Sequence, residues 1–338
     1  MSIEYVNFGT AGVKVTPMAL GLGFRGQFNR DEAEKVILTA LDSGINLIDC
    51  ANVYGFMDDR RNIGSSEQVL GKALKGRRDD VVITSKVFSP IGSGPNDQGP
   101  SRFHIMREVE RSLDRLDTDH IDVYLFHGVD DMSLFEEQFR TMETLIQQGK
   151  IRYVGVSNFQ AWQVMQALEI QKRINAQPLI AVQNPYSLMN RTQEDELFPM
   201  VRETGVGIMA YSPLGVGLLS GTYRADEVPS ESTLWGSKRK GSLNTYIQGR
   251  AGKVISAVSE VAADLGVSMS QVAMAWVMSH PEITVAISGA DTVDQMKDVA
   301  GALELNLPAE AISQLDEVSS GMRAVLDGNP SDVDDDLD

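Results

Sequence analysis

Cysteine is almost absent from this sequence of 338 residues. Cys50 is the only one, so no disulfide can form within the chain, and such a chain fits a reducing compartment best. The sequence also lacks an apolar leader behind Met1 and any run of about 20 apolar residues, the length that spans a membrane. These absences predict a cytoplasmic protein with no membrane partner.

Basic residues are outnumbered, because 30 Lys and Arg face 47 Asp and Glu, for a net charge of −17. Binding to nucleic acid or to an acidic membrane needs clustered Lys and Arg, so we expect neither. Part of the negative charge is local: the segment "DGNPSDVDDDLD" (327–338) has six Asp and no basic residue. This composition predicts a disordered acidic tail over 326–338, behind a single domain over 1–325.

Two kinds of sequence segment alternate along the chain after a hairpin-like start at 5–16. Short apolar, β-branched segments predict strands over 18–23, 45–50, 81–86, 121–127, 152–157, 179–183, 207–212 and 284–288. Apolar residues at helical spacing predict helices over 31–43, 66–75, 102–116, 133–148, 160–171, 193–204, 252–279 (in two pieces) and 292–301. Asn29 is the expected N-cap of the first helix, and Ser43-Gly44 its end.

Eight strand–helix units at a spacing of roughly thirty to forty residues predict a (β/α)8 TIM barrel, an α/β fold. The competing architecture is a doubly wound sheet, for which "GLGFRG" (21–26) is a weak glycine signal. We expect an N-terminal hairpin, a long loop after the seventh strand (218–250) and a C-terminal helix.

Chemically active side chains stand at the ends of three neighbouring predicted strands. Asp49, Lys86 and His127 end the second, third and fourth strands, and Tyr54 follows Asp49 in its loop. Each alone has an ordinary structural explanation, but all four fall at the end of a barrel where active sites lie. Lysine beside tyrosine should lower a phenol pKa of about 10, and a carboxylate keeps that lysine charged.

The histidine can bind a carbonyl oxygen while the tyrosine exchanges a proton with it. This set suits proton delivery to an oxygen whose carbon receives a hydride. It offers neither a nucleophile–base pair for acyl transfer nor the clustered ligands of a catalytic zinc, and we expect no metal.

Seven segments resemble the aldo-keto reductase superfamily, and the resemblance runs from Thr16 to about Ser320. They are "NLIDCANVYG", "GSSEQVLGKALKGRRDDVVITSKV", "SLDRLDTDHIDVYLFHGVD", "GKIRYVGVSNF", "VQNPYSL", "GIMAYSPLGVGLLSG" and "VAISGADTVDQ". The segment "SPIGSGPNDQGPSRFHI" is similar to the branch with aryl-alcohol-dehydrogenase-like and potassium-channel β-subunit-like members. The resemblance implies an NAD(P)(H)-dependent oxidoreductase that interconverts a carbonyl and an alcohol. Its catalytic tetrad would be Asp49, Tyr54, Lys86 and His127, with Tyr54 as proton donor or acceptor.

The resemblance also implies where a nicotinamide dinucleotide lies across the barrel mouth. Ser157, Asn158 and Gln183 would surround the carboxamide, near Asp49, and Tyr211 would stack under the ring. Backbone N–H groups of the segment "SPLGVG" (212–217) would meet the pyrophosphate; the residues assigned there are Ser212, Pro213, Leu214, Gly215 and Gly217. Bordering both cofactor and substrate would be Gly23, Phe24 and Arg25.

At the adenosine end the sequence departs from the family pattern. Asp291, in "GADT", stands where relatives often have arginine, and Thr222 replaces a common lysine. An aspartate there would repel a 2′-phosphate and suit a ribose hydroxyl, which favours NAD(H). Family precedent favours NADP(H), and Lys238, Arg239 and Lys240 could fold over the phosphates, so both cofactors stay open. The other residues assigned to this end are Gly289, Gln295 and Asp298.

The expected substrate is a small carbonyl or alcohol compound. Its pocket would be lined by Arg25, Phe56, Phe88 and His127. Aromatic aldehydes, sugars or glycosides, and ketones all fit these residues, in either direction of reaction. Two other readings stay open: a non-catalytic, cofactor-sensing partner subunit, and a redox-neutral sugar- or glycoside-modifying enzyme that keeps its nicotinamide bound. The oligomeric state is not predicted.

Overall fold

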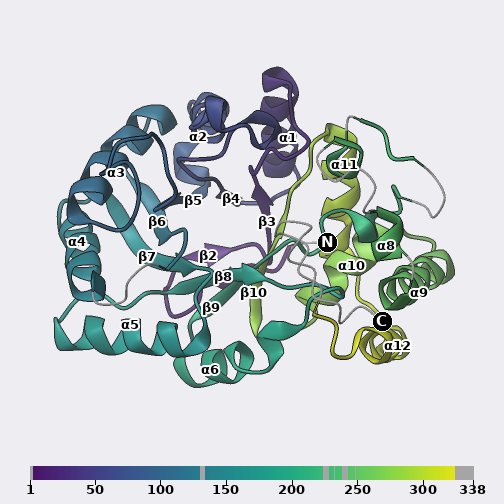
Figure 1. Cartoon of the computed structure of the whole chain (residues 1–338). Coiled ribbons are helices and arrows are strands. Elements are labelled where there is room, and N and C mark those ends of the chain that lie inside the picture. Colours follow the sequence, from purple (N-terminus) through teal and green to yellow (C-terminus); the bar gives the residue numbers. More distant parts are fainter. Residues whose placement is uncertain are drawn as a thin grey trace.

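Eight parallel strands close a barrel in this computed structural model, which describes residues 3–129, 134–223, 228–231, 233–237, 243–247 and 249–323. The strands are β3 (Met18–Gly21), β4 (Leu47–Asp49), β5 (Val82–Val87), β6 (Ile121–Phe126), β7 (Ile151–Ser157), β8 (Ala181–Pro185), β9 (Gly207–Tyr211) and β10 (Ile283–Ser288). Because β10 pairs with both β9 and β3, the ring is complete (Figure 1). The predicted (β/α)8 barrel is confirmed, and the doubly wound sheet is wrong.

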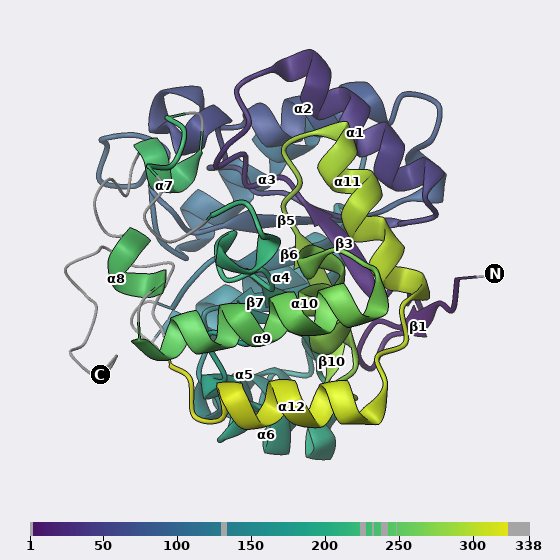
Figure 2. The same ribbon diagram turned by 90° about the vertical axis from the view of Figure 1, so that its right-hand side faces the viewer.

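Helices surround this ring (Figure 1). Those that alternate with strands are α1 (Arg30–Asp42), α2 (Ser65–Ala73), α3 (Arg102–Leu116), α4 (Phe135–Gln147), α5 (Ala161–Arg173), α6 (Leu197–Thr204), α10 (Met269–Met278) and α11 (Val293–Ala300). The additional ones are α7 (Leu234–Ser237), α8 (Leu243–Ile247), α9 (Gly249–Leu265) and the expected C-terminal helix α12 (Ala309–Ser319). Figure 2 shows α12 running alongside α9.

One expectation about helices needs correction. The helix predicted from residue 193 begins at Leu197, because Thr192–Glu194 form a separate 3-10 turn. The expected long loop after β9 contains a 3-10 turn at Leu218–Ser220 and the short helices α7 and α8. The acidic segment 326–338 lies outside the described residues, as do Lys238, Arg239 and Lys240.

Local chemistry explains the ends of α1. The side chain of Asn29 accepts hydrogen bonds from the N–H groups of Asp31 and Glu32, as expected for an N-cap. Ser43 is the C-cap, and Gly44 follows it with φ +82°, a conformation that glycine adopts without strain. The buried residues recur three or four apart, which turns one face of the helix to the barrel; they are Ala33, Val36, Ile37, Ala40 and Leu41.

The hairpin of β1 (Val6–Asn7) and β2 (Lys14–Val15) closes one end of the barrel. Its buried Phe8 joins a hydrophobic cluster with strand residues such as Leu47 and Met209. The hairpin also lies against the start of β9, because a Cβ on Gly9 would come 2.7 Å from the N atom of Gly207. The plugged end is therefore where the strands begin, so the strand C-termini face the other way, toward the loops that carry a site.

No single helix among the described residues is both long and apolar enough to cross a membrane. The helices α9 and α10 meet the criteria only as a pair, and the pair is bent by 101° at its break.

Candidate active site

A buried ion pair joins the ends of β4 and β5. Lys86 Nζ donates to Asp49 Oδ2 at 2.6 Å and to the Cys50 carbonyl at 2.9 Å. The other carboxylate oxygen, Oδ1, accepts from Thr84 Oγ1 at 2.5 Å and Gln183 Nε2 at 2.9 Å. The side chains of Lys86 and Asp49 are 0% and 5% exposed, so this ion pair is shielded from water.

This pairing keeps Lys86 charged. Burial alone would lower the pKa of its ammonium, but the charge and hydrogen bond of Asp49 and the phenol of Tyr54 raise that pKa above its usual range. A permanent positive charge therefore lies beside Tyr54, with Nζ 4.7 Å from the centroid of the phenol ring.

Tyr54 and His127 face each other across the mouth of the barrel. The Tyr54 hydroxyl lies 3.2 Å from His127 Nε2, and the ring planes meet at 77°. On the other side of the imidazole, Ser89 Oγ lies 3.4 Å from Nδ1. If Ser89 donates to Nδ1, the proton of a neutral ring resides on Nε2, which then points at Tyr54.

Burial governs the acidity of both side chains. It raises the pKa of Tyr54, and the opposing charges of Lys86 and then Arg25 do not overcome it. The expected lowering of this pKa is therefore wrong for the protein alone, because desolvation outweighs the ammonium. Burial, followed by the charges of Lys86 and Arg60, lowers the pKa of His127 to about 3. Tyr54 is thus a protonated phenol near neutral pH, and His127 a neutral imidazole.

Side chains assigned to the nicotinamide carboxamide form a connected network at the ends of β7, β8 and β9. Asn158 Nδ2 donates to the His127 carbonyl at 2.9 Å, and its Oδ1 accepts from the Tyr211 hydroxyl at 2.9 Å. Ser157 Oγ donates to the Gln183 carbonyl at 3.0 Å. Gln183 also binds Asp49 through its side chain, so the network reaches the ion pair.

Strained backbone marks the same end of the barrel. Four residues other than glycine have positive φ just past β3, β5, β7 and β9: Phe24 at 50°, Phe88 at 143°, Asn158 at 62° and Ser212 at 55°. Such conformations cost free energy and cluster at functional sites in proteins. All four belong to the residues expected around cofactor or substrate.

The donor set fits a nicotinamide dinucleotide. The half-buried ring of Tyr211 offers a flat surface beside amide groups, and a Cβ on Gly23 would have no neighbour within 4 Å, so space is open past β3. In the segment 212–217 the N–H groups of Gly215 and Gly217 donate within the turn, to Ser212 and Leu214. Fewer N–H groups are thus available to a pyrophosphate than the glycine-rich sequence indicates.

The residues assigned to the adenosine end do not share one hydrogen-bond network. The backbone of Asp291 makes two hydrogen bonds. Its carbonyl accepts from Gln27 Nε2 at 2.7 Å, and its N–H donates to Gln295 Oε1 at 2.8 Å. Its carboxylate accepts from the N–H of Gly26, yet burial dominates and raises its pKa to about 6. Asp298 instead binds Ser268 Oγ at 2.9 Å. Gly289 is exposed.

The aromatic residues assigned to substrate do not form one cluster. Phe24 and Phe56 stack at 4.9 Å, with planes 2° apart. Phe88 lies elsewhere, against Gly128, where a Cβ would come 3.2 Å from its ring. Arg25 is exposed beside these loops.

Sequence reasoning missed Thr84, Ser89 and Arg60. Thr84 lies two residues before Lys86 on β5 and therefore on the same face of the strand, a spacing that could have revealed it. Ser89 and Arg60 lie in loops, where no periodic pattern indicates which way a side chain points.

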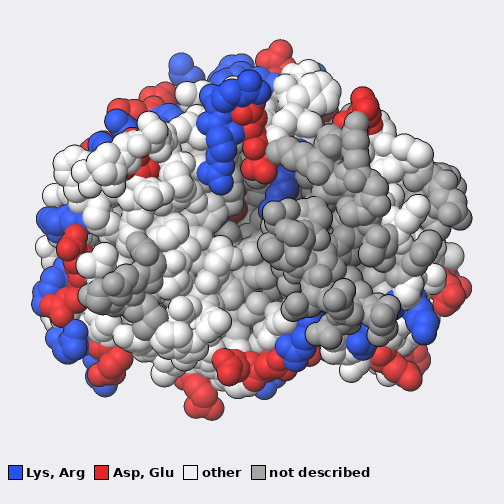
Figure 3. All heavy atoms as spheres, viewed as in Figure 1, with Lys and Arg blue, Asp and Glu red and all other residues white. Residues whose placement is uncertain are grey.

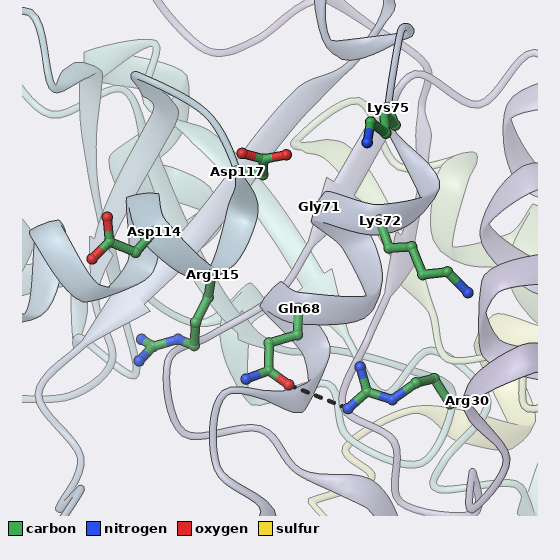
Figure 4. Close-up of a pocket in the computed structure, with 8 residues that line it drawn as sticks. All are labelled: Arg30, Gln68, Gly71, Lys72, Lys75, Asp114, Arg115 and Asp117. Atoms are coloured by element: carbon green, nitrogen blue, oxygen red, sulfur yellow. Dashed lines mark hydrogen bonds between the residues drawn. The ribbon is translucent and has the colours of Figure 1, made fainter.

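A second hollow, of about 500 Å³, lies on the outside of the barrel between α2 and α3 (Figure 4). It mixes charges of both signs, and two of its cations have partners: Lys72 binds Glu34 at 2.5 Å and Arg115 binds Glu67 at 2.6 Å. Arg30 donates to Gln68 at 3.2 Å across its rim. It lies outside the ring of strands and is lined by four basic and two acidic side chains.

Known proteins match nearly the whole chain. The profile of the aldo/keto reductase family covers residues 8–320. An uncharacterized oxidoreductase of Bacillus subtilis (strain 168), YrpG, is 34% identical over 94% of this chain and 97% of its own length. Probable voltage-gated potassium channel beta subunits of Oryza sativa subsp. japonica and Arabidopsis thaliana are each 32% identical, over 94% and 90% of this chain and 96% and 92% of their own lengths.

Proposed function

The chain belongs to the aldo/keto reductase family and is an oxidoreductase, and we propose that it interconverts a carbonyl compound and its alcohol with NAD(P)(H), using Tyr54 as the proton donor. One observation carries the proposal. A protonated phenol stands 3.2 Å from a neutral imidazole and directly beside a buried ammonium. This arrangement can bind an oxygen and give it a proton.

In the reducing direction, a carbonyl oxygen would sit between the Tyr54 hydroxyl and His127 Nε2. The neutral imidazole donates a hydrogen bond that orients and polarises the carbonyl. A bound nicotinamide supplies the hydride for the carbon. Tyr54 gives its proton to the oxygen, and Lys86 stabilises the phenolate that remains. Asp49 keeps Lys86 charged throughout.

The raised pKa of Tyr54 suits this direction. A phenol that stays protonated is ready to act as an acid, whereas alcohol oxidation needs the phenolate. The cofactor would be held by Tyr211, Asn158, Ser157 and Gln183, next to the oxygen site. Its identity as NAD(H) or NADP(H) depends on Asp291, which argues for NAD(H) against family precedent.

A second candidate function has its own support. Two relatives of similar identity are described as probable potassium channel beta subunits. On this alternative the chain would bind a dinucleotide and act chiefly as a partner subunit. The intact set of Asp49, Tyr54, Lys86 and His127 makes catalysis the stronger proposal.

The test begins with the purified protein, which is denatured so that any released dinucleotide can be identified. Carbonyls and alcohols are then screened with that dinucleotide. Tyr54→Phe should lower kcat by roughly 100- to 10,000-fold while dinucleotide binding persists. Tyr5→Phe is the matched control, because that exposed hydroxyl binds the Gly44 carbonyl far from the strand ends. Equal activity in the Tyr54 variant would reject the proton-donor role.

A further inference from the structure

The loop between β4 and α2 carries two neighbouring arginines with different surroundings. Arg61 is held by Asp59, which accepts from its Nε at 2.9 Å and from its Nη2 at 2.7 Å. Arg60 is exposed and makes no hydrogen bond or ion pair with another residue in the part of the chain that the structure describes. Its guanidinium, with five N–H donors, is therefore available to a ligand.

Arg60 lies near the candidate active site because its loop folds back at Gly55. A Cβ on Gly55 would come 2.7 Å from the Asp59 carbonyl and 2.6 Å from that of Asn62. The segment 59–62 thus packs directly on the residue that follows Tyr54. The positive charge of Arg60, after burial and Lys86, contributes to the low pKa of His127, which places it within electrostatic reach of the imidazole.

Arg25 approaches the same site from the loop after β3. Burial, Lys86 and Asp49 dominate the pKa of Tyr54, and Arg25 is the further charge that acts on it. The two loops are tied together, because the N–H of Met57 donates to the Gln27 carbonyl at 3.0 Å and Phe24 stacks on Phe56. Arg25 and Arg60 therefore lie on two connected loops, and the charge of Arg25 acts on Tyr54 while that of Arg60 acts on His127.

The molecule as a whole is acidic. The net charge is −17, and Figure 3 shows both Lys or Arg and Asp or Glu side chains on the upper rim of a hollow near the middle of one face. A dinucleotide is itself an anion, so its phosphates compete as an explanation. However, His127 follows β6, which lies opposite β10 in the barrel order, and Asp291 follows β10. The charge of Arg60 acts on His127, where the substrate carbonyl would bind, and the dinucleotide affinity of the Arg60→Gln variant tests the competing explanation.

We propose that Arg60, assisted by Arg25, binds an anionic group of the substrate, so that the preferred substrates are aldehydes or ketones that also carry a carboxylate or a phosphate. A guanidinium suits both groups, because its paired N–H donors match two oxygens of either. This inference rests on the proposed function for the carbonyl and on Arg60 for the anion.

Binding is measured first, by titration calorimetry of the full chain with saturating dinucleotide. The probes are 4-(hydroxymethyl)benzoate and the neutral 4-methylbenzyl alcohol. We expect the anion to bind roughly 10- to 100-fold more tightly, as for a charge-assisted hydrogen bond. Arg60→Gln should remove most of this ratio. Arg61→Gln, the matched control, should keep it, because Arg61 is already held by Asp59.

Turnover gives the second readout, as the ratio of kcat/KM for 4-formylbenzoate to that for 4-methylbenzaldehyde. The corresponding ratio of kcat/KM for glyceraldehyde 3-phosphate to that for glyceraldehyde shows whether the site prefers a phosphate or a carboxylate. Equal affinities of charged and neutral probes, or a ratio that Arg60→Gln leaves intact, would overturn the inference. So would a loss of dinucleotide affinity in Arg60→Gln with the ratio unchanged. If no aldehyde is reduced while the benzoate still binds through Arg60, the anion site stands and the proposed function fails.

Discussion

Two half-buried side chains near the mouth of the barrel respond to acid with opposite sign. The pKa of His127 is lowered to about 3, so between pH 6.5 and 3 the unfolded chain binds a proton that the folded chain refuses. Stability therefore falls as the pH drops through that window. The pKa of Asp291 is raised to about 6, so as the pH falls the folded chain binds this proton before the unfolded chain does. The stability that this proton contributes is therefore lost as the pH rises from about 4 to 6.

The His127→Gln variant isolates the first effect. Relative to the variant, the wild type should lose about 2 kcal/mol of unfolding free energy between pH 7 and pH 5. Urea unfolding at both pH values measures this difference. Asp291→Asn serves as a control of opposite sign, because the wild type should gain stability relative to it over the same interval. If the unfolding free energies of the wild type and His127→Gln change equally between the two pH values, the imidazole is protonated normally in the folded state.

Asp291 also gives the cofactor prediction at this scale. Asp291→Arg should raise the affinity for NADP(H) relative to NAD(H) by about tenfold or more, because a carboxylate that repels a 2′-phosphate becomes a guanidinium that binds it. Dissociation constants of both dinucleotides give the ratio. Asp294→Arg makes the same charge change at an exposed position on α11. If both variants shift the ratio equally, general charge and not the place of Asp291 would be the cause.

Single residues also show where sequence reasoning ends. Asp49, Lys86 and His127 lie at the ends of strands. Those ends can be located in the sequence, because a buried strand is an apolar segment. The pKa of Tyr54 could not be predicted, because it depends on how deeply the folded chain buries the phenol. Likewise, the hydrogen bond from Gln183 to Asp49 joins residues 134 positions apart. No local pattern encodes such a contact.

At the scale of elements, the loop between β4 and α2 positions both Tyr54 and Arg60. Its fold depends on Gly55, whose Cα approaches two backbone carbonyls too closely for a side chain. Helices and strands were predictable from periodicity to within a few residues, as α3 at Arg102–Leu116 illustrates. This loop was not, since its shape is set by contacts with the neighbouring loop at Gln27.

Gly55→Ala tests that dependence. The added Cβ meets backbone atoms of Asp59 and Asn62, which cannot rotate away, so the loop must shift. We expect kcat/KM to fall by about 100-fold, as for a displacement of about 1 Å in a catalytic group. Gly12→Ala is the control, because a Cβ there meets nothing within 4 Å. Unchanged kinetics in Gly55→Ala would mean that the loop does not position Tyr54.

For the whole molecule, residues near both ends of the described chain contact distant parts of the barrel. Near the start, Phe8 packs among the side chains that fill the barrel interior. Near the end, the Met322 carbonyl accepts from the N–H of Arg191, and Arg323 binds Asp195 at 2.6 Å. Strands from both halves of the chain pair at the junction of β10 and β3. One half therefore has no complete core without the other, which favours a single folding unit.

We accordingly expect one cooperative urea transition, with the same midpoint by circular dichroism and by tryptophan fluorescence. Fluorescence samples three regions. Exposed Trp162 lies on α5, buried Trp235 donates to the Val216 carbonyl near the mouth, and buried Trp276 donates to Asp316 on α12. Deleting residues 326–338 removes six Asp and should leave the midpoint and slope unchanged. Two separate transitions would contradict a single domain over 1–325, and a lower midpoint after the deletion would show that the acidic segment contributes to the fold.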